Sequence, residues 1–346
     1  MFLHRSFIHH NHSNFCLKMK QLITILLSLA LLSTQAQYAG MTAVNFGNTK
    51  GLVRLPANYA TQPNKRFPLI LHFCGNGEVG TNLSLLLNTG FGRQVALGKI
   101  SGTVADSIIH VIVQSPSSGA IRLPSAINPA IDYIFKNYRV DTSADANGKY
   151  ANIVLAGLSQ GASDVWDINA WTGSGYGDPK YAGRFGKIFL MSIPSASAFP
   201  DAACLQRIKG GYYKFFHGDN DQQGCCALWP VQGLVVSLTN SGSKASLTIV
   251  KGGTHGNDVW DLGWSPANKD TSDNMYLQAI KDWIPSQPPA VINEYYQPAK
   301  FYYADANSFV KIELSGTAVY ADPSFTQLKE YRLIDGTVCK TVITRL

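Results

Sequence analysis

A serine set between two glycines is the feature of this sequence with the clearest chemical meaning. Residues 157–161 read Gly-Leu-Ser-Gln-Gly, which matches the pattern GxSxG. The apolar run at 153–156 predicts a buried strand before the motif, and residues 160–171 follow it with the period of a helix. So tight a strand-to-helix turn needs neighbours with almost no side chain, and it raises the serine hydroxyl above the sheet. We therefore predict that Ser159 is a nucleophile.

A serine hydroxyl is a weak nucleophile at neutral pH, and histidine is the usual base that activates it. Where a serine sits on such a turn, the acid and then the histidine follow it along the chain. Two histidines, His217 and His255, come after Ser159. His255 lies in a glycine-bounded loop directly after the last predicted strand of the sheet, so we predict that it is the general base.

The acid that orients such a histidine must lie at a strand end near the imidazole. Asp219 and Asp221 follow another predicted strand and both meet this condition. Asp258 and Asp261 are a fallback, because residues so close to His255 in sequence rarely reach its far ring nitrogen. The residues alone leave the choice between Asp219 and Asp221 open.

Acyl transfer also needs donors for the negative oxygen of the intermediate, and two backbone N–H groups usually supply them. We predict one donor at Gln160, directly after the nucleophile. The other is predicted at Asn76, in a loop at 74–80 whose three glycines allow close approach to a substrate. This mechanism implies no metal and no organic cofactor, and the sequence has no CxxC or Cys/His metal spacing.

The elements that would position these residues alternate between strand and helix. Short apolar or β-branched runs predict strands at 67–73, 108–114, 151–156, 187–192, 212–216 and 245–250. Segments of helical period predict helices at 126–138, 160–171, 227–239 and 274–283. This order predicts an α/β fold with a mostly parallel, doubly wound sheet covered on both faces, and residues 43–55 would add antiparallel edge strands.

The two ends of the chain depart from this pattern. The apolar run at 22–32 follows Lys18 and Lys20 and is too short to span a bilayer, which takes roughly 20 residues. We interpret residues 1–36 as a signal peptide with an upstream extension, cleaved after Ala36. The mature protein is then expected to be secreted or periplasmic, with no membrane partner.

A proline-rich stretch divides the rest of the chain. It predicts a linker at 285–290 after a catalytic domain at 37–284. Short strands are expected at 301–303, 308–314, 317–320 and 330–334, so we predict that residues 291–346 form a small β-rich appendage, an incomplete module.

Charge and cysteine content narrow the set of partners. The formal net charge of +7 falls to +4 without residues 1–36, which carry three basic residues and no acidic one. The sequence has no cluster of lysine and arginine residues that could bind a phosphate backbone, so nucleic acid is not an expected partner. In an exported chain we expect one disulfide from Cys204 to Cys225 or Cys226, and Cys74 as a small buried thiol.

Four motifs in this order resemble those of secreted α/β-hydrolases of the polyhydroxybutyrate depolymerase and feruloyl or acetyl-xylan esterase type, a group that includes predicted peptidases. GNGEVG at 75–80 resembles the group's HGxGExG oxyanion loop, with Cys74 in place of its histidine. GLSQG at 157–161, with Trp166, resembles its GLSMGG…W segment. FHGDND at 216–221 is similar to its FHGxxD segment, which assigns the acid to Asp221.

The fourth motif, Thr254-His255 with Trp260, resembles the group's GHxxxW segment, and the likeness covers roughly residues 50–285. It implies an α/β-hydrolase fold and a serine esterase, acting first of all on acetyl or feruloyl esters of plant polysaccharide. Trp260 and Trp229 would offer flat rings to the sugar. Polyester depolymerase, serine peptidase and non-catalytic polysaccharide binder remain alternatives, and the oligomeric state is left open.

Overall fold

The computed structural model describes residues 38–100, 105–171, 175–194, 200–221 and 226–264, and the backbone of five strands between residues 299 and 339. The chain divides into two compact units, Met1–Ser265 and Pro266–Leu346. The predicted signal peptide at 1–36, the helix at 274–283 and the linker at 285–290 lie outside the described residues, so they stay predictions.

The first unit is built on an eight-stranded sheet with the strand order β1-β2-β4-β3-β5-β6-β7-β8. Its first two strands pair antiparallel at the edge, and the other six run parallel to one another. The strands are β1 (Thr42–Asn45), β2 (Lys50–Arg54), β3 (Leu69–Phe73), β4 (Ile109–Gln114), β5 (Tyr150–Leu158), β6 (Phe185–Met191), β7 (Tyr212–Gly218) and β8 (Lys244–Val250). All six predicted parallel strands and the antiparallel edge are confirmed, with strand ends within two residues of the prediction.

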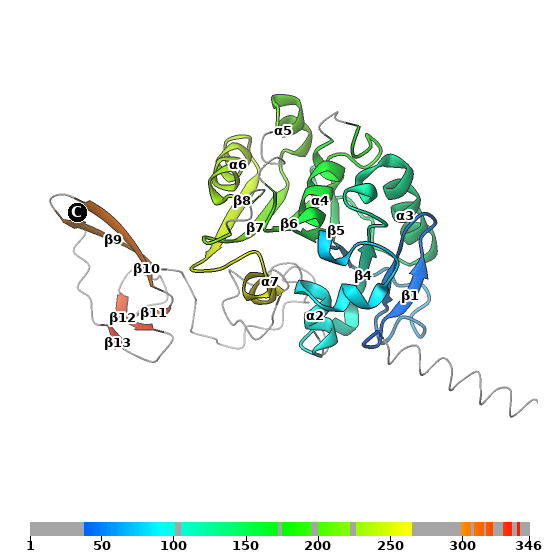
Figure 1. Ribbon diagram of the computed structural model, residues 1–346, viewed down its shortest axis with the longest axis horizontal. Helices are drawn as coiled ribbons and strands as arrows, with labels where there is room; N and C mark the ends of the chain where they lie inside the picture. Colours follow the sequence, from blue (N-terminus) through cyan, green and yellow to red (C-terminus); the bar gives the residue numbers. More distant parts are fainter. Residues whose placement is uncertain are drawn as a thin grey trace, which may run out of the picture. The chain divides into compact units, whose positions relative to one another are not determined.

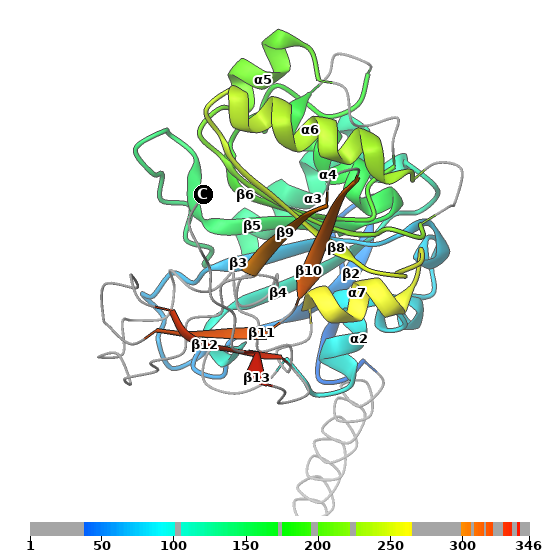
Figure 2. The ribbon, with the colours of Figure 1, turned by 90° about the vertical axis from the view of Figure 1, so that its left-hand side faces the viewer.

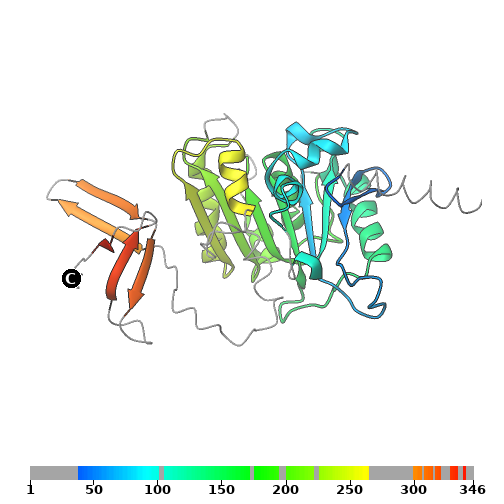
Figure 3. The same cartoon turned by 90° about the horizontal axis from the view of Figure 1, so that it is seen from below.

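Helices cover both faces of this sheet (Figures 1 and 2). The predicted helices correspond to α3 (Pro124–Asn137), α4 (Gln160–Ala170) and α6 (Leu228–Asn240). Three shorter helices, α2 (Gly90–Ala96), α5 (Ala202–Ile208) and α7 (Asn257–Trp264), were not predicted. The helices α2 and α7 pack against each other on the face opposite α3, α4 and α6 (Figure 3). Among the described helices, none has the length and apolar character needed to cross a bilayer.

Burial explains why the sheet could be predicted. Every residue of β3 and β4 is buried, because helices cover both faces, and such strands are continuously apolar rather than alternating. Helix α4 is buried from Gly161 to Ala170, so it fixes the end of β5 from which it departs. Since parallel strands end at the same edge, the carboxyl ends of β5, β7 and β8 bring their following loops together there.

The second unit contains two small antiparallel sheets. The first pairs β9 (Ala299–Asp305) with β10 (Ser308–Leu314). The second has β12 (Leu328–Leu333) between β11 (Gly316–Tyr320) and β13 (Val338–Cys339). The four strands predicted in this region are present, although the domain boundary predicted at residue 284 is not tested.

The expected disulfide from Cys204 to Cys225 or Cys226 is not formed in the structure. Cys204 lies on α5 as a buried free thiol, and its Sγ is 3.8 Å from the Trp171 carbonyl oxygen, to which it donates. The thiol therefore faces the end of α4, whereas Cys226 lies beside Asp221. Cys225 is outside the described residues. Cys74 is a buried thiol, as predicted.

Candidate active site

Ser159 occupies a strained turn between β5 and α4. Its backbone angles are φ 51° and ψ −122°, in the positive-φ region that side chains rarely adopt. A Cβ on Gly157 would lie 2.2 Å from the Gly161 carbonyl oxygen, and a Cβ on Gly161 would lie 2.3 Å from the Phe73 carbonyl oxygen. Only glycine fits at both positions, which explains the GxSxG spacing. The turn leaves Ser159 at the carboxyl end of β5.

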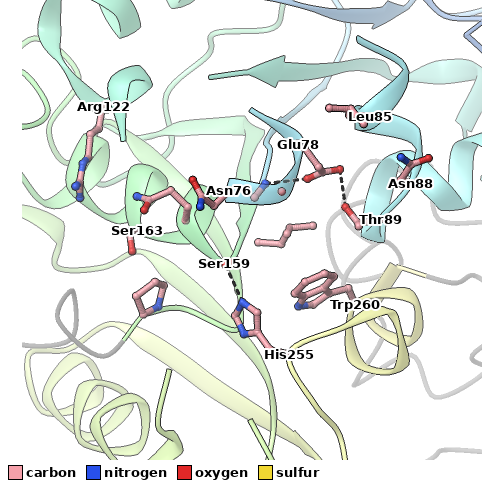
Figure 4. A pocket seen from close by; sticks show the side chains of 15 residues that line it. Asn76, Glu78, Leu85, Asn88, Thr89, Arg122, Ser159, Ser163, His255 and Trp260 are labelled. Carbon is pink, nitrogen blue, oxygen red and sulfur yellow. Dashed lines mark hydrogen bonds between the residues drawn. The ribbon is translucent and has the colours of Figure 1, made fainter. Parts of the chain in front are cut away.

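Three side chains form a continuous chain of hydrogen bonds at this edge. The His255 Nε2 atom is 2.8 Å from Ser159 Oγ (Figure 4). The His255 Nδ1 atom is 2.7 Å from Asp221 Oδ2. A carboxylate only accepts, so Nδ1 carries the proton and Nε2 is free to accept the serine hydroxyl hydrogen. The Asp221 carboxylate is fully buried and the His255 side chain is 13% exposed, so solvent does little to weaken their attraction.

The structure distinguishes the aspartates that the sequence left open. Asp221 contacts the imidazole, whereas Asp219 Oδ1 accepts a hydrogen bond from Gly252 N at 2.5 Å. Asp219 therefore ties the turn after β7 to the loop that carries the histidine. Asp258 and Asp261 bond to other residues, Thr254 and Arg93 respectively.

A second histidine lies beside the acid, a position that was not predicted. The His217 Nε2 atom donates to the Cys226 carbonyl oxygen at 2.8 Å and lies 3.7 Å from Asp221 Oδ2. Burial lowers the pKa of His217, so its ring stays neutral at physiological pH. In the sequence, the position of His217 near the end of a predicted strand, four residues before Asp221, could have indicated that it lies close to the acid.

The residues of the two predicted oxyanion donors line one cavity together with the serine. Gln160 is the first residue of α4, and Asn76 is the first residue of the 3-10 helix η1 (Asn76–Glu78). Amides in a first helical turn have no acceptor within the helix, so they can point at a ligand. The loop before η1 packs on the serine turn, since a Cβ on Gly75 would lie 2.6 Å from Leu158 Cδ1 and 3.6 Å from Ser159 Cβ.

Cys74 takes the place of the histidine expected in this loop. Its Sγ accepts a hydrogen bond from Ser115 N at 3.4 Å, and its own amide donates to the Val113 carbonyl oxygen at 3.3 Å. Burial raises the pKa of the Cys74 thiol, so it stays protonated and acts as a small packing residue.

A cavity of about 530 Å³ opens over the serine. Leu85, Asn88, Thr89 and Trp260 line it on one side of Ser159 in Figure 4, and Arg122 and Ser163 line it on the other. Leu85 and Trp260 give the first side apolar surface, and Arg122 gives the second side a cationic group.

The two tryptophans predicted to hold sugar rings occupy different environments. Trp260 is a cavity wall, because its Nε1 donates to Ser192 Oγ at 3.0 Å and its ring lies edge-on to His255 with a centroid distance of 5.2 Å. Trp229 is 67% exposed and is not among the residues that line the cavity.

Arg122, which lines the cavity, is held in place by two acids and an aromatic ring. Its Nη1 donates to Asp167 Oδ2 at 2.6 Å, its Nε is 3.8 Å from Asp164 Oδ1, and its guanidinium lies 3.8 Å from the centre of the Tyr176 ring. Burial raises the pKa of Asp164 to about 7. Asp167 balances part of the Arg122 charge, and the guanidinium can donate further hydrogen bonds to a polar ligand.

One group of metal-ligating side chains occurs among the described residues. Ligand atoms of Asp221, Cys226 and His255 all lie within 4.8 Å of one another. An ion there would displace the hydrogen bond between His255 and Asp221, so these residues fit the hydrogen-bonded arrangement better than a metal centre.

Of the comparisons with known proteins, the one with solved structures bears on the fold. No family model and no curated protein matches the sequence. Esterase 2 of Thermogutta terrifontis phosphorylated by paraoxon matches with a TM-score of 0.51 at 14% identity, over 72% of this chain and 97% of that one. The same esterase phosphonylated by sarin matches with a TM-score of 0.50 at 13% identity, over 72% and 98%.

A thermostable esterase also matches, with a TM-score of 0.50 at 18% identity over 69% of this chain. The match spans 62% of that esterase. At these identities the likeness concerns the fold. The eight-stranded, mostly parallel sheet with helices on both faces is that of the α/β-hydrolases, so this chain has the α/β-hydrolase fold that the sequence predicted.

Proposed function

We propose that this protein is a serine esterase that hydrolyses carboxylic esters through an acyl-enzyme on Ser159. The observation that carries the proposal is the chain of hydrogen bonds from Ser159 through His255 to Asp221, at a strained strand-to-helix turn. The esterase structures that share the fold support the same reaction class.

The reaction begins with attack of Ser159 Oγ on the ester carbonyl carbon, while His255 Nε2 takes the hydroxyl proton. The carbonyl π electrons move to oxygen, and the N–H groups of Asn76 and Gln160 donate to the resulting oxyanion. Asp221 keeps the imidazole in the required tautomer and stabilises the imidazolium.

Collapse of the tetrahedral intermediate breaks the bond to the alcohol, which leaves with the proton held by His255. A water molecule then gives its proton to the same imidazole and attacks the acyl carbon. The second collapse restores the Ser159 hydroxyl and releases the carboxylic acid. No other reactant is required, so the cycle balances with ester and water alone.

The preferred substrates are acetyl or feruloyl esters of a plant polysaccharide, acted on after export of the protein from the cell. A cavity of about 530 Å³ falls within the usual range for small-molecule sites and has room for an aromatic acyl group. Leu85, Leu158 and Trp260 give apolar surface for that group, and Arg122 gives a donor for hydroxyl or carbonyl oxygens of the other portion.

A substrate panel tests this proposal. The purified protein would be assayed on 4-nitrophenyl acetate, methyl ferulate, acetylated xylan, 3-hydroxybutyrate oligomers and a peptide. We expect hydrolysis of the carbohydrate-type esters, and a loss of roughly 10³-fold or more in kcat for Ser159→Ala and His255→Ala. Ser237→Ala, at a half-buried position of α6 where the hydroxyl donates to the Gly233 carbonyl oxygen of the same helix, is the matched control and should leave turnover unchanged.

Different results point to different failures. Cleavage of the hydroxybutyrate oligomers alone would make the protein a polyester depolymerase, and cleavage of peptides alone would contradict any esterase assignment. Turnover that survives Ser159→Ala would show that the nucleophile lies elsewhere. Binding of the polysaccharide with no hydrolysis of any substrate would favour a non-catalytic binding protein.

A further inference from the structure

We propose that Glu78 is a positioning residue that sets the direction of the oxyanion donor at Asn76. The proposal rests on the esterase function above. Glu78 is 4% exposed, and both of its carboxylate oxygens are occupied: Oε2 accepts from Gly75 N at 2.8 Å and Oε1 accepts from Thr89 Oγ1 at 2.5 Å. Figure 4 shows Glu78 between the loop that carries Asn76 and the start of α2.

Glu78 holds the same glycine a second time through its backbone. Its own amide donates to the Gly75 carbonyl oxygen at 3.1 Å. The Gly75 carbonyl and the Asn76 N–H belong to one planar peptide group and point in opposite directions. When the carbonyl is fixed, the direction of the Asn76 N–H is fixed too.

Glu78 is itself anchored to the sheet. Gln114, the last residue of β4, is 1% exposed, and its Nε2 donates to the Glu78 carbonyl oxygen at 2.7 Å and to the Asn82 carbonyl oxygen at 2.8 Å. A continuous set of hydrogen bonds therefore runs from the sheet to the peptide that offers the oxyanion donor. These hydrogen bonds support a loop in which Cys74 replaces the histidine of the similar family, because Cys74 has no imidazole to bond to the loop glycines.

The Glu78 side chain holds Gly75 and Thr89 through hydrogen bonds rather than through an ion pair. Among the described residues, no lysine, arginine or histidine forms an ion pair with Glu78, and burial raises its pKa to about 7. A full negative charge beside the developing oxyanion would oppose the reaction. A neutral amide at position 78 can still accept from Gly75 N with its oxygen and donate to Thr89 Oγ1 with its nitrogen.

Three variants test this role on 4-nitrophenyl acetate. Glu78→Ala should lower kcat by roughly 10- to 100-fold and leave KM within about threefold, because the oxyanion exists only in the transition state. Glu78→Gln should keep kcat within about threefold of wild type. Asp132→Ala, which removes a half-exposed acid on α3 distant from the site, is the control and should match wild type.

Several outcomes would overturn the proposal. These are a kcat for Glu78→Ala within twofold of wild type, a rise in KM with unchanged kcat, or equal losses in Glu78→Gln and Glu78→Ala. If Glu78→Ala does not fold, Thr89→Val takes its place, since it removes one of the two partners and should lower kcat several-fold. Normal turnover in Glu78→Ala and Thr89→Val, with an inactive Ser159→Ala, would contradict the positioning role of Glu78 alone. An active Ser159→Ala would contradict the esterase mechanism.

Discussion

At the scale of single residues, two aspartates two positions apart do different work. The Asp221 carboxylate accepts from the His255 ring, and Asp219 accepts from the Gly252 amide. The proposed mechanism needs the negative charge of the first, because it stabilises the imidazolium and fixes the tautomer. It needs only an acceptor oxygen from the second, which an asparagine also provides.

Asp221→Asn should therefore lower kcat by about 10²- to 10⁴-fold, because the amide cannot stabilise the imidazolium and can favour the wrong tautomer. Asp219→Asn should keep kcat within about threefold, since its oxygen can still accept from Gly252 N. Steady-state kinetics of the two variants at one pH make the comparison. Equal losses in both would contradict the assignment of the acid.

The sequence predicted residue types better than residue contacts. Ser159, His255 and the pair of aspartates follow from spacing and strand ends, and the likeness of residues 216–221 to FHGxxD favoured Asp221. The contacts of Glu78 and the position of Cys204 did not follow, because they depend on which way a loop or a short helix turns in three dimensions. The disulfide expected from Cys204 failed for this reason.

At the scale of elements, the turn between β5 and α4 tolerates no side chain at Gly157 or Gly161. A Cβ on Gly157 would lie 2.2 Å from a backbone oxygen, which cannot move without shifting α4. Gly233 on α6 is the opposite case, because its Cβ would meet nothing within 4 Å.

Gly157→Ala should destabilise the protein by roughly 3 kcal/mol or more and abolish turnover, since overpacking here displaces the nucleophile. Gly233→Ala should be neutral or stabilise by up to about 1 kcal/mol, because alanine favours helix over glycine. Denaturant unfolding of both variants measures the difference. A Gly157→Ala variant as stable and active as wild type would contradict the close packing of the turn.

The strands and longer helices were predictable because their periodicity is strong and burial is continuous. The helices α2, α5 and α7 are only seven or eight residues long, and α2 contains Gly90 and Gly92, which disfavour helix. A Cβ on Gly92 would lie 1.7 Å from the Leu86 carbonyl oxygen, so packing against η2 (Leu83–Leu87) requires this glycine. Contacts between distant parts of the chain determine the structure of these short helices, and the local sequence does not reveal such contacts.

At the scale of the whole molecule, stability should depend on pH through buried histidines. His72 in β3 is 2% exposed, and burial lowers its pKa from 6.5 to about 3. Burial also lowers the pKa of His110 in β4 to about 3. Between pH 6.5 and 3 the unfolded chain binds protons that the folded chain cannot, so the contribution of these groups is present above pH 6.5 and lost as pH falls.

The buried acids act in the opposite sense. Burial raises the pKa of Glu78 and Asp164 to about 7, so the folded chain holds protons that the unfolded chain has released, and their effect favours low pH. A variant that removes one histidine isolates its contribution, because the acids are the same in both proteins.

We expect His72→Gln to show a smaller fall in melting temperature between pH 7 and pH 4 than wild type, by several degrees. Thermal unfolding followed by circular dichroism at both pH values measures this. Identical falls in the two proteins would contradict a neutral, buried His72.

The arrangement of the whole first unit was predictable because a parallel sheet brings the loops after β5, β7 and β8 to one edge, whatever their separation in sequence. From Ser159 to His255 the chain runs through three further strands, yet the two side chains are 2.8 Å apart. That convergence is the basis of the proposed function.

The most direct test is to locate a covalent label. The protein would be treated with a fluorophosphonate, and the modified residue identified by mass spectrometry of its peptides. The account predicts a single adduct on Ser159, none in Ser159→Ala, and much slower labelling in His255→Ala. An adduct on another residue, or unchanged labelling of Ser159→Ala, would contradict it.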